Sequence, residues 1–95
     1  MKLFIDTHDK NKETFPAQIS PEQLSEFYSN YRKIFAEEGV VIVRTFLGLG
    51  EGRAFCLNMA KSADDVKRAH DRVGLPYDSI TEVTGVSPND LLLNL

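Results

Sequence analysis

Few side chains in this sequence could do chemistry, and most of them are ligand types for a transition metal. They are one aspartate, both histidines, the lone cysteine and the tyrosines: Asp6, His8, His70, Cys56, Tyr28, Tyr31 and Tyr77. Imidazole and thiolate suit zinc, nickel or copper, and a carboxylate can add an oxygen ligand. Asp6, His8, Cys56 and His70 are therefore the candidate metal ligands, and Tyr28 and Tyr31 are candidates to line a pocket.

Each candidate also has a purely structural interpretation. Cys56 can be a small buried hydrophobic residue, and His70 can be a hydrogen-bonded core histidine on an apolar helix stripe. Tyr28 and Tyr31 can be core residues with a solvated hydroxyl. His8 is harder to explain in this way, because a strand that ends in Asp-x-His needs partners for both side chains. No two candidates have the short spacing of a CxxC or HExxH motif, so only the fold could gather them.

The elements that would position these residues follow from periodicity and capping signals. Two helices are predicted: one begins at the cap Ser20 and ends at Gly39, and the other begins at Ser62 and ends at Gly74. A short helical extension is expected over 87–95. The predicted strands, rich in apolar or β-branched residues, cover residues 2–8, 40–47, 53–59 and 79–86.

This β-α-β-β-α-β order predicts an α+β fold of the ferredoxin-like kind, as a single domain over 1–95. Right-handed crossovers would place both helices on one face of a four-stranded antiparallel sheet. His8, at the end of the first strand, and His70, late in the second helix, should then lie toward the same end of the sheet, with Tyr28 nearby.

Strand alternation complicates this gathering of ligands. If Phe55 and Leu57 face the helices, then Cys56 lies on the opposite face of the sheet together with Asp6 and His8. His70 would then be separated from the other candidates unless the strand end twists toward it.

The apolar pattern of the strand at 40–47 indicates that both faces of the sheet are covered. Alternation places Val41 and Val43 on one face and Val40, Ile42 and Phe46 on the other, so both faces are apolar. Two helices can cover only one face, and a second copy of the chain is the simplest cover for the other. We therefore expect a homodimer, a dimeric α/β barrel.

Composition narrows the classes of function. The chain has 95 residues, 42% of them hydrophobic and 26% charged, which is typical of one small globular domain. A net charge of −3 gives no sign of nucleic-acid binding. The apolar runs fall well short of the roughly 18 residues of a membrane span, and the N-terminus lacks a signal-peptide pattern. The lone Cys56 excludes an internal disulfide. Together with the charge and the short apolar runs, this leads us to expect a cytoplasmic protein with no membrane or nucleic-acid partner.

The order of these motifs resembles a known family, the small nickel-binding, ferredoxin-like proteins of bacteria, formerly a domain of unknown function. The matching segments run through residues 3–86: Phe4-Ile5-Asp6-Thr7-His8, Ser20-Pro21-Glu22-Gln23-Leu24, Glu37-Glu38-Gly39-Val40, Phe55-Cys56-Leu57, Ser62, His70, Gly74-Leu75-Pro76 and Glu82-Val83. The resemblance implies dimers whose sheets face each other and binding of a divalent transition metal, nickel in the characterised branch. By motif match, the ligands would be Asp6, His8, Cys56 and His70. Family members often carry a His-x-x-Asp pair on the first helix, where this chain has Tyr28 and Tyr31.

Three functions remain open on this basis. The first is a small cytosolic dimeric protein that binds a divalent transition metal such as Ni²⁺, with the sequence favouring a binding protein over an enzyme without deciding between them. The second is a small-molecule-binding protein or enzyme of the dimeric α/β-barrel type, with Tyr28, Tyr31 and His70 lining a pocket and His70 as general base. The third is an interaction module that docks a partner through its dimer face or through the leucine-rich segment 90–95.

Overall fold

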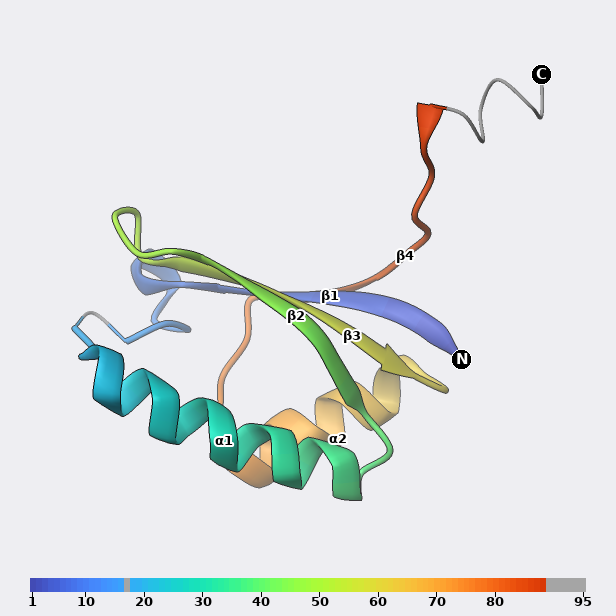
Figure 1. Cartoon of the computed structure of the whole chain (residues 1–95), viewed down its shortest axis with the longest axis horizontal. Coiled ribbons are helices and arrows are strands. Elements are labelled where there is room, and N and C mark those ends of the chain that lie inside the picture. The colour runs from blue at the N-terminus through green and yellow to red at the C-terminus, as the bar shows by residue number, and fades with distance from the viewer. Residues whose placement is uncertain (17, 89–95) are drawn as a thin grey trace.

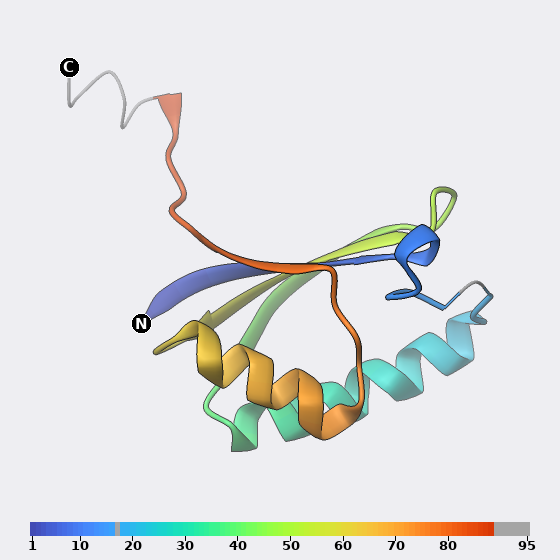
Figure 2. The same cartoon turned by 180° about the vertical axis from the view of Figure 1, so that it is seen from behind.

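The computed structural model describes residues 1–16 and 18–88, which form an α+β domain (Figure 1). Two helices cover one face of a four-stranded antiparallel sheet whose strand order is β2-β3-β1-β4, as in a ferredoxin-like domain (Figure 2). The elements in chain order are β1 (Lys2–Asp9), the 3₁₀ turn η1 (Lys10–Lys12), α1 (Pro21–Glu37), β2 (Val41–Gly48), β3 (Arg53–Ala60), α2 (Ala63–Val73) and β4 (Ser79–Val83). The predicted strands and helices are confirmed, although β4 ends three residues earlier than expected. The helical extension expected over 87–95 falls mostly on residues 89–95, outside the described part.

Local capping determines where the helices begin and end. The Ser20 hydroxyl accepts from the Gln23 backbone N–H at 3.1 Å, and the Gln23 side chain accepts from the Ser20 N–H at 2.9 Å. This capping box satisfies two of the backbone groups that a helix start leaves unpaired. At its C-terminal end, α2 stops at Gly74, whose φ of +67° is readily adopted only by glycine. The chain therefore turns sharply after α2 and returns Leu75 and Pro76 toward the sheet.

The hydrophobic core lies between the sheet and the two helices. Its members are fully buried and come from β1, α1, the turn before β2, β3 and α2: Phe4, Phe35, Val40, Ala60, Val66 and Ala69. Along β1 the buried positions alternate, so Asp6 and His8 follow Phe4 on the helix-facing side of the sheet. Two polar residues thus extend the same line of buried side chains as the core.

Phe55 and Leu57 do not face the helices, so the condition that would have separated His70 from the other candidate ligands is not met. On β3 the buried residues are Ala54, Asn58 and Ala60, while Phe55 and Leu57 are only half-buried. Small side chains let the helices pack closely onto this strand, and the larger ones point to the open face. Cys56 pairs with Asp6 in the β1–β3 register, so Asp6, His8 and Cys56 lie on the same side as the helices, and His70 is not separated from them.

A bulge in β2 changes the predicted alternation of that strand. The pairing with β3 shifts between Ile42 and Arg44, so one extra residue is inserted at Val43. Phe46 therefore pairs with Phe55 on the open face instead of lying with Ile42, as alternation alone predicted. The open face also carries Val41, opposite Met59.

None of the helices in residues 1–16 and 18–88 is long and apolar enough to cross a membrane.

Candidate metal centre

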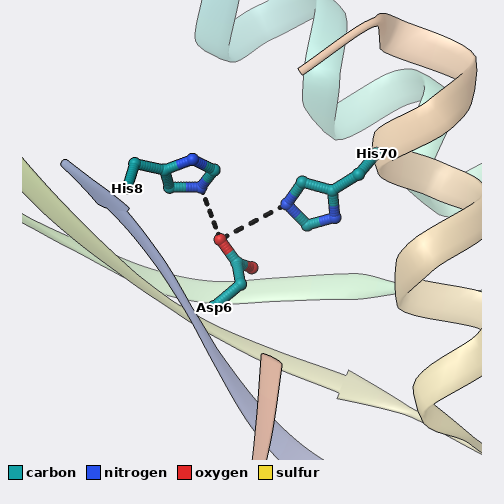
Figure 3. Close-up of side chains that lie close together, drawn as sticks. All are labelled: Asp6, His8 and His70. Atoms are coloured by element: carbon teal, nitrogen blue, oxygen red, sulfur yellow. Dashed lines mark hydrogen bonds and ion pairs between the residues drawn. The ribbon is translucent and has the colours of Figure 1, made fainter. Parts of the chain in front are cut away.

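Three buried side chains meet between β1 and α2. Asp6 and His8 project from the helix-facing side of β1, two residues apart, and His70 projects toward them from the last turn of α2 (Figure 3). Their exposed fractions are 0%, 3% and 1% for Asp6, His8 and His70. The expectation that His8 and His70 lie at the same end of the sheet is thus met, and Asp6 lies between them.

Both imidazoles direct the same ring nitrogen at one carboxylate oxygen. His8 Nε2 lies 2.6 Å from Asp6 Oδ1, and His70 Nε2 lies 3.3 Å from the same oxygen. One ligand atom from each of Asp6, His8 and His70 lies within 4.8 Å of the other two. Two imidazole nitrogens and one carboxylate oxygen at this separation could hold a metal ion.

The other ring nitrogens are held by the backbone. His8 Nδ1 lies 2.8 Å from the Pro76 carbonyl and 3.1 Å from the Thr14 carbonyl, and His70 Nδ1 lies 2.8 Å from the Val66 carbonyl. A carbonyl oxygen only accepts hydrogen bonds, so each Nδ1 must carry the hydrogen. The Nε2 atoms are then the nitrogens with lone pairs when the rings are neutral. Backbone contacts of this kind orient histidine ligands in metal sites.

Asn58 orients the carboxylate. Its Nδ2 donates to Asp6 Oδ2 at 2.5 Å, which leaves Oδ1 for the two histidines. Asn58 is fully buried, and its own Oδ1 has no hydrogen-bond partner among the described residues. The sequence interpretation missed Asn58. The signal that could have found it is a polar residue two positions after Cys56 in an otherwise apolar strand.

The electrostatics of the group combine burial with mutual attraction. Burial alone would raise the pKa of Asp6, but hydrogen bonds and charge from His70 and His8 outweigh it and lower that pKa to about 2. Burial alone would lower the pKa of His8, but Asp6 and the Pro76 and Thr14 carbonyls outweigh it and raise that pKa. These opposite shifts widen the pH range over which the metal-free pair is a protonated imidazole beside an ionised carboxylate.

Cys56 lies beside this group but is not one of its three members. It stands opposite Asp6 in the β1–β3 register and accepts a long hydrogen bond from the Thr45 hydroxyl at 3.7 Å. Burial and the neighbouring Asp6 carboxylate raise the pKa of the Cys56 thiol to about 12. A metal would have to displace the thiol proton before Cys56 could bind it as a thiolate.

The two tyrosines of α1 line a cavity next to these residues. The cavity has a volume of about 290 Å³, and Asp6, His8, Cys56 and His70 line it together with Tyr28 and Tyr31. Burial raises the pKa of Tyr31 to about 12, with a smaller contribution from Cys56, so its hydroxyl stays protonated. Tyr77 lies outside the cavity lining and packs edge-on against His70, with ring centroids 5.1 Å apart.

Comparison with known proteins identifies the family. The family model described as nickel responsive protein SCO4226-like matches residues 4–83. The crystal structure of SCO4226 from Streptomyces coelicolor A3(2) superposes with a TM-score of 0.74 at 26% identity, over 90% of this chain and 99% of that one. No curated protein matches the chain. The family match covers most of the chain and includes Asp6, His8 and His70, and the chain therefore belongs to the SCO4226-like family of nickel responsive proteins.

Proposed function

We propose that this protein binds a divalent transition metal, Ni²⁺ first among them, through Asp6, His8 and His70. The observation that carries the proposal is the shared orientation of the two imidazoles. Each Nδ1 donates to a backbone carbonyl, and each Nε2 points at Asp6 Oδ1. Two nitrogen lone pairs and a carboxylate thus converge on one buried point.

The chemistry of the three donors fits a borderline cation. Imidazole suits nickel, zinc, copper and iron, whereas calcium and magnesium prefer sites built entirely from oxygen. The description of the family as nickel responsive favours nickel within this set. A bound cation would replace the proton that His8 otherwise needs beside Asp6, so the buried carboxylate would keep a positive partner.

Cys56 is the fourth ligand predicted from the sequence, and we propose that it joins the site only as a thiolate. Its thiol lines the same cavity, next to Asp6. A thiolate would add a soft donor to the two imidazoles, which favours nickel, zinc or copper over harder cations. Tyr28 and Tyr31 have no place in this ligand set, because a protonated phenol is a poor metal ligand.

The test is calorimetric titration of Ni²⁺ into tag-free, chelator-treated protein at pH 7.5. We expect saturable binding of one ion per chain, weakened by more than about 100-fold in each of Asp6→Asn, His8→Gln and His70→Gln, since each change removes a direct ligand. Asp71→Asn is the matched control, because Asp71 is next to His70 in α2 but is exposed. Circular dichroism of each variant checks that the fold persists.

Absence of Ni²⁺ binding in the wild type would contradict the proposal. So would variants at the three positions that bind as well as the Asp71→Asn control.

We also propose that the protein is a homodimer whose open sheet faces meet as a dimeric α/β barrel. Apolar side chains on this face support the proposal: Val41 and Phe46 are 53% and 51% exposed, and Phe55, Leu57 and Met59 beside them are half-buried. A contiguous apolar face of this kind is unusual on a monomer. A second copy would present the same strands and could cover it symmetrically.

A further inference from the structure

The cavity beside the three ligands has one polar end and one apolar wall. Asp6, His8, His70 and Asn58 line the polar end. The wall comes from the loop before α1 and from the first half of that helix, and its members are Phe15, Ile19, Leu24, Phe27, Tyr28 and Tyr31. A metal held by Asp6 and the histidines would therefore face a cavity whose lining is largely hydrophobic.

The size of this space suits a small organic molecule. Its volume is about 290 Å³. An apolar protein cavity of about 150 Å³ is enough to hold benzene. There is thus room for a single ring with a short polar substituent, and little room for anything as large as a nucleotide.

The charge balance at the polar end favours an anion. A divalent cation brings two positive charges, and Asp6 is the acidic side chain in direct contact with both histidines. While Cys56 keeps its thiol proton, these three ligands, with neutral imidazoles, leave one positive charge uncompensated among the buried side chains of the site; Glu13, the other acidic side chain in the cavity lining, is exposed. Such a charge is costly unless a counter-charge lies beside it. A ligand with one carboxylate would supply that counter-charge.

Asn58 adds a requirement for a hydrogen-bond donor. Its Oδ1 is buried and has no partner among the described residues, although its Nδ2 is committed to Asp6. A buried acceptor without a donor costs free energy, and a donor on the ligand would recover it. A hydroxyl on the carbon next to the carboxylate would let one ligand supply both the negative charge and the donor.

We propose that the metal-loaded site binds a small apolar 2-hydroxycarboxylate. The carboxylate compensates the charge of the cation, the hydroxyl donates to Asn58 Oδ1, and the apolar group lies against Leu24, Tyr28 and the rest of the α1 wall. The inference rests on the proposed metal binding and specifies the second ligand of the same site.

Three matched probes test the assignment: mandelate, phenylacetate, which lacks the hydroxyl, and lactate, which lacks the ring. Each is titrated calorimetrically into protein loaded with one equivalent of Ni²⁺, and into metal-free protein. We expect mandelate to bind Ni²⁺-loaded protein at least about tenfold more tightly than it binds metal-free protein. Phenylacetate should bind about tenfold more weakly than mandelate, because Asn58 Oδ1 stays unpaired. Lactate should also bind about tenfold or more weakly, because the apolar wall stays uncovered.

A cavity-filling variant separates the pocket from the metal. Leu24→Trp should weaken mandelate binding by about tenfold or more and leave the Ni²⁺ affinity unchanged, because Leu24 lines the wall and is not one of the metal ligands. Ser25→Trp is the matched control, since Ser25 is exposed on the same turn of α1.

The outcomes distinguish this inference from the proposed function. The 2-hydroxycarboxylate assignment is overturned if mandelate and phenylacetate bind with equal affinity, or if mandelate binds metal-loaded and metal-free protein equally well. If Ni²⁺ binding is normal in that case, the proposed metal site is unaffected. Failure of the wild type to bind Ni²⁺ would overturn both.

Discussion

The contact between His8 and Asp6 predicts how metal affinity depends on pH. His8 Nδ1 donates to the Pro76 and Thr14 carbonyls, and Nε2 lies 2.6 Å from the Asp6 carboxylate, so the metal-free ring has an acceptor for a proton on each nitrogen. The pKa of His8 is accordingly raised above its usual value of 6.5. Ni²⁺ needs the Nε2 lone pair and must displace that proton.

The magnitude follows from proton competition. Well below pH 6.5 the His8 imidazole is protonated in the metal-free protein, so each further pH unit lost weakens the apparent affinity about tenfold, or about 1.4 kcal/mol. Asp6 contributes nothing in this range, because its pKa is lowered to about 2 and it stays ionised. From pH 6.5 to pH 5.5, competition by this one proton should therefore raise the apparent Kd for Ni²⁺ by a factor of about five to ten.

The assay is calorimetry at pH 5.5, 6.0 and 6.5 in two buffers that differ in ionisation enthalpy. The difference in heat between the buffers counts the protons released per bound ion, and we expect at least one. If Cys56 binds as a thiolate, the count exceeds that of Cys56→Ser by one. An affinity that is the same at pH 5.5 and 6.5, with no proton released, would refute the assignment of Nε2 as the ligand atom.

Four further predictions concern the stability and assembly of the protein. Without metal, the raised pKa of His8 stabilises the fold fully below pH 6.5, so the free energy of unfolding in chelator should fall as the pH rises from 6 to 9. The lowered pKa of Asp6 works in the opposite direction, and about 2 kcal/mol should be lost in acid as the pH falls from 4 to 2, measured by urea denaturation. Asn58→Leu removes the hydrogen-bond donor to Asp6 Oδ2, so it should destabilise the metal-free protein by about 2 kcal/mol. The same change should weaken Ni²⁺ binding about tenfold to 100-fold. An unchanged Ni²⁺ affinity would show that Asn58 does not orient the carboxylate. Phe46→Lys places a charge on the open sheet face and should halve the mass measured by light scattering, and a wild-type mass equal to one chain would contradict the dimer.

The order of the elements could be predicted from the sequence because the signals are local. The capping box at Ser20 and the glycine that ends α2 at Gly74 each involve residues a few positions apart. The sequence also predicted that His8 and His70 lie at one end of the sheet, because the order of the elements sets the direction of each strand and helix.

The face of each strand could not be predicted in the same way. On β3, Phe55 and Leu57 are larger and more hydrophobic than Ala54 and Cys56, so hydrophobicity alone assigns them to the core. The structure reverses this order because small residues permit close packing of the helices. In β2, the bulge near Val43 moves Phe46 to the other face, and nothing in the local pattern marks that insertion.

The hydrogen-bond partners of the two histidines could not be predicted from the sequence either, because most of them are backbone atoms. The carbonyls of Thr14 and Pro76 reach His8 from segments 6 and 68 residues away along the chain. Any residue type provides a carbonyl, so only the path of the chain could reveal them. This path determines which imidazole nitrogen is free, and hence what the site can bind.

Tyr28 and Tyr31 link the metal site to the cavity. The family resemblance predicts a histidine and an aspartate at these positions of α1, and their replacement removes two ligand types from that helix. Asp6, His8 and His70 come from β1 and α2, so this group of three is complete without α1. The tyrosines instead add aromatic surface to the cavity wall beside the group. If the two tyrosines contact an organic ligand, Tyr31→Asp should weaken mandelate binding to the Ni²⁺-loaded protein. The new carboxylate would repel the mandelate anion, and the apolar area of the cavity wall would be smaller. Tighter mandelate binding in this variant would contradict the role assigned to the α1 wall.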